Sequence, residues 1–245
     1  MKKFIASIVI STILCNLSAC NNTQETINNS HKEETLMITN QMTFQEIANE
    51  LEKLGITDIS EETIKNLEIF WADTPDEFAE DLYKTPLLLT SIGGGSYDYD
   101  NHTWTPSSSQ LYSFDVEVFD IGQMYTLFLQ GISAISNHEF EITNVVEDTS
   151  KVNFAEGTGT QIIHFDCNGH SYTYEATANG DWFDVGMLNF MNEVLSKENC
   201  SKQLYFMMDG GQECIIFLCT KDWAAQFAQV TGFELINVFP ATKDF

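Results

Sequence analysis

The sequence contains no arginine. Its 11 basic residues are all lysines, and 36 aspartates and glutamates outnumber them, which gives a formal net charge of −25 at pH 7. Proteins bind nucleic acids by neutralising backbone phosphates with lysine and arginine, and anionic lipid headgroups attract basic segments. The composition therefore argues against a nucleic-acid partner and against a folded part that lies on an anionic membrane. Solubility is the simplest use of such acidity, and capture of cations is the alternative.

Short motifs of familiar catalytic chemistry are also missing. The sequence has no G-x-S-x-G elbow, no glycine-rich phosphate loop and no H-E-x-x-H helix. Its later cysteines lack the close paired spacing of zinc sites, and Cys214 and Cys219 are expected on opposite faces of one strand, where they cannot bridge each other. We therefore predict no cofactor. A disulfide and buried free thiols both remain open for the four late cysteines, which are Cys167, Cys200, Cys214 and Cys219.

Long apolar runs are absent as well. The N-terminal run from Phe4 to Leu14 is too short to cross a bilayer, which takes roughly 20 apolar residues. Lys2 and Lys3 precede this run and small residues follow it, an order typical of an export signal.

The four residues Leu17-Ser18-Ala19-Cys20 close this segment and resemble the lipobox of bacterial lipoprotein precursors. The resemblance implies cleavage before Cys20, a lipid on its sulfur, and a protein held to the extracytoplasmic side of the cell membrane, with the bilayer as its partner. It implies nothing about the fold. A plain secretory signal with a chance cysteine is the alternative.

The rest of the chain divides by composition. Residues 1–19 are the expected signal peptide, and 20–42 are the lipidated cysteine and a polar tether without sustained periodicity. Residues 43–85 are expected to form a helical cap or subdomain, and 86–245 an α+β domain.

Three short helices are predicted in the cap. Thr43 and Glu46 have capping-box spacing, Ser60 starts a second helix with Ile64, Leu67, Phe70 and Trp71 inward, and Thr74-Pro75 starts a third with Phe78 and Leu82 buried. The run from Leu87 to Thr90 then predicts a buried strand.

The remaining segments predict an antiparallel sheet of β-hairpins packed by helices. The best-specified hairpin turns at Asn168-Gly169, which places Cys167 opposite His170 and Phe165 opposite Tyr172. A second hairpin crosses Gly210-Gly211 and is apolar on both faces, with Leu204, Phe206, Ile215 and Phe217 on one face, so it should lie centrally in its sheet or be covered on both sides. The other expected elements are listed here in chain order. They are a hairpin from Tyr97 to Thr105, a strand from Leu111 to Phe119 with Ser113 on its polar face, a helix capped by Asp120, a strand from Phe140 to Val146, a loop at Gly157 to Gly159, a helix opened by Asp181 to Asp184, a helix from Lys221 to Thr231 that is closed by Gly232, and an edge strand from Glu234 to Phe239.

Two groups of residues are candidate metal ligands. His164 and Asp166 share one strand face, with Thr173 or Glu175 on the neighbouring strand, although a metal needs three or four ligands. Asp98 and Asp100 form an oxygen-rich stretch that lacks the glycine and glutamate of an EF-hand. The alternatives are an ordinary polar strand face and cross-strand aromatic pairing.

Candidate catalytic groups are equally sparse. Asp181 and Asp184 have a spacing compatible with paired acids for glycoside hydrolysis, but acids are also expected at a helix start. Cys167 and His170 are the elements of a thiol nucleophile, yet both face a core, where we expect a partly buried histidine and an inert thiol.

A four-residue pattern recurs at two predicted helix starts. Phe119-Asp120-Ile121-Gly122 and Phe183-Asp184-Val185-Gly186 each join a strand region to a helix. A duplicated strand-helix-strand unit and chance recurrence of helix-start chemistry both account for it.

These observations favour a non-enzymatic, membrane-anchored binding or protective module for a protein or peptide partner. The negative charge would steer a cationic partner. The alternative is a surface hydrolase that uses carboxylates near Asp181, Asp184 or Asp209.

Overall fold

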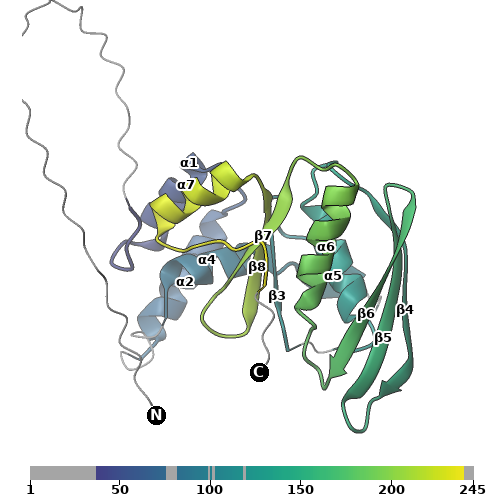
Figure 1. The fold of residues 1–245 in the computed structure, drawn as a ribbon. Coiled ribbons are helices and arrows are strands. Elements are labelled where there is room, and N and C mark those ends of the chain that lie inside the picture. The colour runs from purple at the N-terminus through teal and green to yellow at the C-terminus, as the bar shows by residue number, and fades with distance from the viewer. Residues whose placement is uncertain (1–36, 76–81, 99, 101–102, 118–119, 240–245) are drawn as a thin grey trace, which may run out of the picture. The chain divides into compact units, whose positions relative to one another are not determined.

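The computed structural model describes residues 37–75, 82–98, 100, 103–117 and 120–239, and it confirms the α+β class (Figure 1). The predicted signal peptide, the lipobox and most of the tether lie outside the described residues. Helices and antiparallel sheets alternate in four layers, which two hydrophobic cores hold together.

The first sheet consists of β3 (Leu111–Asp115), β8 (Glu213–Cys219) and β7 (Gln203–Met208), in that spatial order. As the sequence predicted, the β7–β8 hairpin is apolar on both faces because both faces are covered. Ile215 and Phe217 enter one core, and Cys214 and Ile216 enter the other.

The predicted pairing of faces within this hairpin is wrong. Tyr205 pairs with Phe217 and Phe206 with Ile216, so Leu204 and Phe206 share a face with Ile216 and not with Ile215. The prediction assumed a two-residue turn, but the backbone N–H of Asp209 donates to the carbonyl of Glu213, which leaves a three-residue loop. One extra loop residue shifts the register by one and exchanges the two faces.

The second sheet consists of β4 (Ile142–Asn153), β5 (Thr158–Cys167) and β6 (His170–Asn179). The register predicted for the β5–β6 hairpin is confirmed, including the pairs of Cys167 with His170 and Phe165 with Tyr172. Asn168 and Gly169 have φ of 51° and 82°, the left-handed values that this tight turn requires.

Helices α5 (Met124–Ala134) and α6 (Gly186–Lys197) lie between the two sheets (Figure 1). On the other face of the first sheet, four helices of the described part of the chain share the second core with the sheet. These helices are α1 (Phe44–Lys53), α2 (Glu61–Asp73), α4 (Lys84–Gly93) and α7 (Lys221–Thr231). A small separate hairpin pairs β1 (Ser96–Asp98) with β2 (Thr103–Thr105), as predicted.

Local capping chemistry determines several helix ends as predicted. Thr43 and Glu46 form a complete capping box at α1, and the side chain of Ser60 accepts the backbone N–H of Thr63 at α2. Gly232 ends α7 with φ of 76°.

The predicted strand from Leu87 to Thr90 is wrong, because these residues lie within helix α4. A short apolar run does not distinguish a buried strand from a buried helix. Pro86 lies in the first turn of α4, where no intrahelical bond needs its missing N–H. The predicted helix that starts at Thr74-Pro75 lies largely outside the described residues.

Three burial predictions also need correction. Phe70 is 49% exposed, because α2 buries only a narrow stripe around Leu67. The side chain of His170 is 73% exposed, although it stands on the α6 side of the hairpin. Ser113 is buried on β3, where its hydroxyl donates to the carbonyl of Thr90.

Some boundaries differ from the predicted ones. Helix α5 begins four residues after Asp120, and α6 begins at Gly186. β3 ends at Asp115, β4 continues to Asn153, and Thr158 and Gly159 belong to β5. The expected C-terminal strand is reduced to one antiparallel bridge between Ile236 and Phe206.

Candidate functional site

The described surface has two neighbouring hollows with volumes of about 320 Å³ and 710 Å³, and Ser109 and Asn137 line both. We call them together the Asn137 groove. The smaller hollow has an apolar floor that includes Phe217, Leu218 and Trp223. The larger one has a mostly polar lining, which consists of Ser109, Ser133, Ala134, Ser136, Asn137, His138, Phe140, Glu141 and Asn168.

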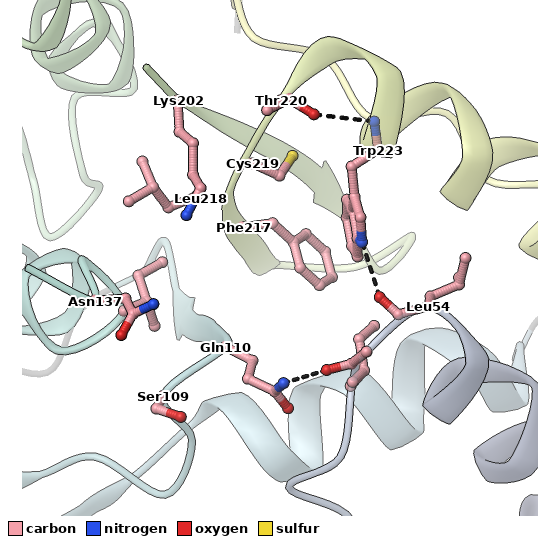
Figure 2. A pocket seen from close by; sticks show the side chains of 13 residues that line it. Leu54, Ser109, Gln110, Asn137, Lys202, Phe217, Leu218, Cys219, Thr220 and Trp223 are labelled. Atoms are coloured by element: carbon pink, nitrogen blue, oxygen red, sulfur yellow. Dashed lines mark hydrogen bonds between the residues drawn. The ribbon is translucent and has the colours of Figure 1, made fainter. Parts of the chain in front are cut away.

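The walls of the smaller hollow come from segments far apart in the sequence and are fixed by hydrogen bonds. Nε1 of Trp223 donates to the carbonyl of Leu54 over 2.9 Å, and Nε2 of Gln110 donates to the carbonyl of Gly55 (Figure 2). Oε1 of Gln110 accepts the backbone N–H of Thr57 at 2.6 Å. These bonds hold the end of α1, the start of β3 and the start of α7 together, so the hollow is pre-formed.

The loop between the two hollows has an unusual backbone. Asn137 and His138 follow each other with φ of 47° and 65°. Consecutive non-glycine residues in the left-handed region are uncommon and are enriched at functional sites. No sequence pattern predicted this loop, although asparagine and histidine are among the residues that more often adopt positive φ angles.

An ion pair stands beside the groove. Nζ of Lys202 lies 3.3 Å from Oε1 of Glu139, and the hydroxyl of Ser201 donates to Oε2 of the same carboxylate. The hydrogen bond from Lys202 is the largest cause of a lowered pKa of Glu139. Lys202 and Asn137 lie on one side of the smaller hollow, and Trp223 and Leu54 on the other (Figure 2).

A partly buried carboxyl, Glu147 on β4, faces the start of α5. It accepts hydrogen bonds from the backbone N–H of Thr126 and from Nε2 of Gln161, which also donates to the carbonyl of Ile121. Burial raises the pKa of Glu147 to about 7, and the charge of Asp120 raises it further, while the hydrogen bonds lower it. Glu147 thus caps a helix that is distant from it in the sequence.

A second carboxyl group with a raised pKa, that of Glu213, lies at the far end of the first sheet. Glu213 pairs across the strands with Asp115. Burial raises its pKa to about 7, and the like charges of Asp115 and Asp209 add to the effect.

The predicted catalytic pair has structural contacts. Oδ1 of Asp184 accepts the backbone N–H of Gly186 at 2.9 Å, and Oδ2 accepts that of Thr177 at 3.0 Å. These contacts favour the helix-start interpretation of Asp184, and Asp181 lies in the turn just before it. Catalysis by the pair stays a hypothesis.

The two copies of the repeated helix-start pattern have equivalent aspartate contacts in the structure. Oδ1 of Asp120 accepts the backbone N–H of Gly122 at 3.0 Å, as Oδ1 of Asp184 does with Gly186. Each aspartate thus makes the same two-residue turn ahead of its helix. Such turns are common chemistry for aspartate, so duplication and chance both stay open. Phe119 lies outside the described residues.

The four late cysteines form no disulfide, and His170 is paired with a carboxylate. Cys167, Cys200, Cys214 and Cys219 are free. Burial raises the pKa of Cys167 to about 12, which makes a thiolate nucleophile unfavourable. His170 instead contacts Glu198 at 3.0 Å, and Tyr172 donates to the same carboxylate.

The candidate metal ligands are already paired. Nδ1 of His164 lies 2.9 Å from the hydroxyl of Thr173, and Asp166 accepts hydrogen bonds from Asn144 and Ser171. Among the described residues, no group of three histidines, cysteines or acids is placed to hold a metal ion. Asp98 accepts the backbone N–H of Asp100 at 2.9 Å, while three of their neighbours, residues 99, 101 and 102, are not described.

Comparisons with known proteins add no further constraint: no family model, curated protein or solved structure matches this chain. None of the helices in the described part of the chain is long and apolar enough to cross a membrane.

Proposed function

We propose that this chain is an acidic binding module, anchored to the extracytoplasmic side of a bacterial membrane by lipid on Cys20, and that the Asn137 groove receives a segment of a protein or peptide partner. The observation that carries the proposal is the groove itself, a pre-formed hollow with an apolar floor and a hydrogen-bonding rim. Binding sites in proteins commonly combine these two features.

The rim chemistry suits a peptide segment. Asn137 and Ser133 offer an amide and a hydroxyl group, which are able both to donate and to accept hydrogen bonds. Such groups match the N–H and C=O of any peptide backbone, while the floor at Phe217 and Leu218 takes an apolar side chain. Glu141, at the rim of the larger hollow, adds a negative charge, and Lys202, which lines the smaller hollow, adds a positive one.

Charge sets the kind of partner. The chain carries 36 acidic and 11 basic residues, so its field attracts cations at a distance. A positively charged partner would associate faster than a neutral one, and added salt would slow that association. A cationic enzyme or toxin on the cell surface is the partner class that this charge favours, and its capture would protect the cell.

Capture from the native cell envelope tests the proposal. The lipidated protein, reconstituted in vesicles, should retain a cationic protein at low salt and release it as salt rises. Ser109 is exposed and lines both hollows, so the bulky ring of Ser109→Trp should obstruct the groove and weaken retention. Ser91→Trp, at an exposed serine of α4 that does not line the groove, is the matched control and should not. Equal retention by the two variants would exclude the groove as the binding site.

A further inference from the structure

The strand β6 lies at an edge of the second sheet, since the sheet order is β4-β5-β6. Its neighbour β5 occupies one side. The hairpin register fixes which backbone groups face the other side, because the N–H and C=O groups of successive residues point in alternate directions.

Two contacts establish this direction. The backbone N–H of Thr177 donates to Oδ2 of Asp184, and the carbonyl of Asn179 accepts the N–H of Trp182. The backbone N–H and C=O groups of the odd-numbered residues of β6 therefore point away from β5. These contacts cover the end of the strand. Ahead of them, the outward backbone groups of three exposed residues meet no hydrogen-bond partner within the described structure, namely those of Ser171, Thr173 and Glu175.

The free edge runs beside an aromatic strip. The side chains of Tyr172 and Tyr174 alternate with the exposed ones and point toward α6, where Phe190 stands 5.1 Å from the ring of Tyr174. All three rings are only half-buried. A strand added at this edge would therefore find backbone partners and, on the α6 side, apolar surface for every second side chain.

The opposite edge of the same sheet is protected in the usual way. β4 has register shifts after Thr143 and after Asp148, and Asn144 has φ of 53°. Such bulges keep edge strands from pairing with another chain. β6 pairs with β5 without any register shift and contains neither proline nor lysine. Glu175 is therefore the one charged side chain of β6 that opposes pairing with another strand.

We propose that the β6 edge binds an extended segment of a partner protein as an added strand, and that this segment carries lysine or arginine alternating with apolar residues. The inference rests on the proposed role in binding a cationic partner and adds how that partner is held. Glu175 on the edge and Asp166 on the adjacent strand provide the complementary charge, and both side chains lie on the sheet face away from α6. Pairing between two copies of this chain is disfavoured, since every copy is strongly acidic and like charges repel.

Synthetic peptides test the edge with the unaltered protein. A short peptide of alternating lysine and valine should bind at low salt and shift the backbone amide resonances of Thr173 and Glu175. The same peptide with every second backbone nitrogen methylated, on the side that faces β6, keeps its charge but loses its donors, and should bind about tenfold more weakly or worse. A glutamate and valine peptide should not bind.

Two substitutions test the same edge from the protein side. Thr173→Pro removes an outward N–H that makes no bond to β5, whereas Thr173→Val keeps it; only the first should weaken binding. Glu175→Lys should also weaken binding of the lysine peptide, while Glu52→Lys, an equal change of charge at an exposed position of α1, should have little effect. Thermal melting checks that each variant is folded.

The possible results separate the two proposals. Equal affinity of the methylated and unmethylated peptides, or resonance shifts confined to residues of the Asn137 groove, would overturn strand addition and leave the binding role in place. Absence of lysine peptide binding at low salt would overturn strand addition. If, in addition, no cationic protein is retained from the envelope, the binding role fails as well.

Discussion

Glu147 makes the stability of this protein depend on pH in a direction opposite to that of most carboxylates. Its pKa is about 7 in the folded protein, against 4.5 for an unperturbed glutamate, so the folded state binds the proton more tightly. The resulting stabilisation is fully present below about pH 4.5 and is lost as pH rises through about 7. The difference between the two pKa values is equivalent to about 3 kcal/mol at full ionisation. Because water still reaches part of the side chain, we expect about 2 kcal/mol.

Replacement by glutamine isolates this contribution. Glu147→Gln cannot ionise, and its carbonyl can still accept the backbone N–H of Thr126. The free energy of unfolding of the wild type minus that of Glu147→Gln should fall by about 2 kcal/mol between pH 5 and pH 8. Urea unfolding followed by circular dichroism measures it, with Glu52→Gln at an exposed site of α1 as the control. A difference that stays constant, or that grows toward pH 8, would refute the assignment of a buried, proton-binding Glu147.

Four further substitutions test separate parts of the structure. Glu213→Gln should raise the melting temperature at pH 8 more than at pH 5, because Asp115 and Asp209 no longer repel a neighbouring charge; an equal change at both pH values contradicts this. Gly131→Ala should cost about 2 kcal/mol in urea unfolding, since a Cβ there would lie 2.4 Å from the ring of Tyr112. Asp184→Ala should lower the free energy of unfolding by about 1 kcal/mol through the loss of its helix-start contacts. If the variant instead stays fully stable and loses a hydrolytic activity of the wild type, the hydrolase alternative is favoured. Cys20→Ala should move the protein from the membrane fraction to the soluble fraction, and a variant that stays with the membrane would contradict the lipid anchor.

Local chemistry made part of the fold predictable from the sequence. The capping box at Thr43, the Asn168-Gly169 turn and the glycine after α7 act within a few residues, and the structure has all three as expected. Two-sided apolar character also correctly indicated a covered, central β8.

Tertiary contacts decided what the sequence left ambiguous. The run from Leu87 to Thr90 became helix because α4 packs among helices on the sheet face, and one extra residue in the loop before Glu213 reversed the faces of a hairpin. The cap of α5 comes from Glu147, which no local pattern links to that helix. Likewise, the Asn137 groove joins segments that are far apart in the chain, so no motif marks it.

In the proposed function, the Asn137 groove of an acidic, anchored module receives a cationic partner. The most direct measurement is the amount of cationic protein retained from the cell envelope by vesicle-bound wild type, Ser109→Trp and Ser91→Trp across a salt series. We predict strong retention by the wild type and Ser91→Trp at low salt, loss of retention as salt rises, and weak retention by Ser109→Trp throughout. Retention that is equal for all three proteins, or that is independent of salt, would contradict the proposed function.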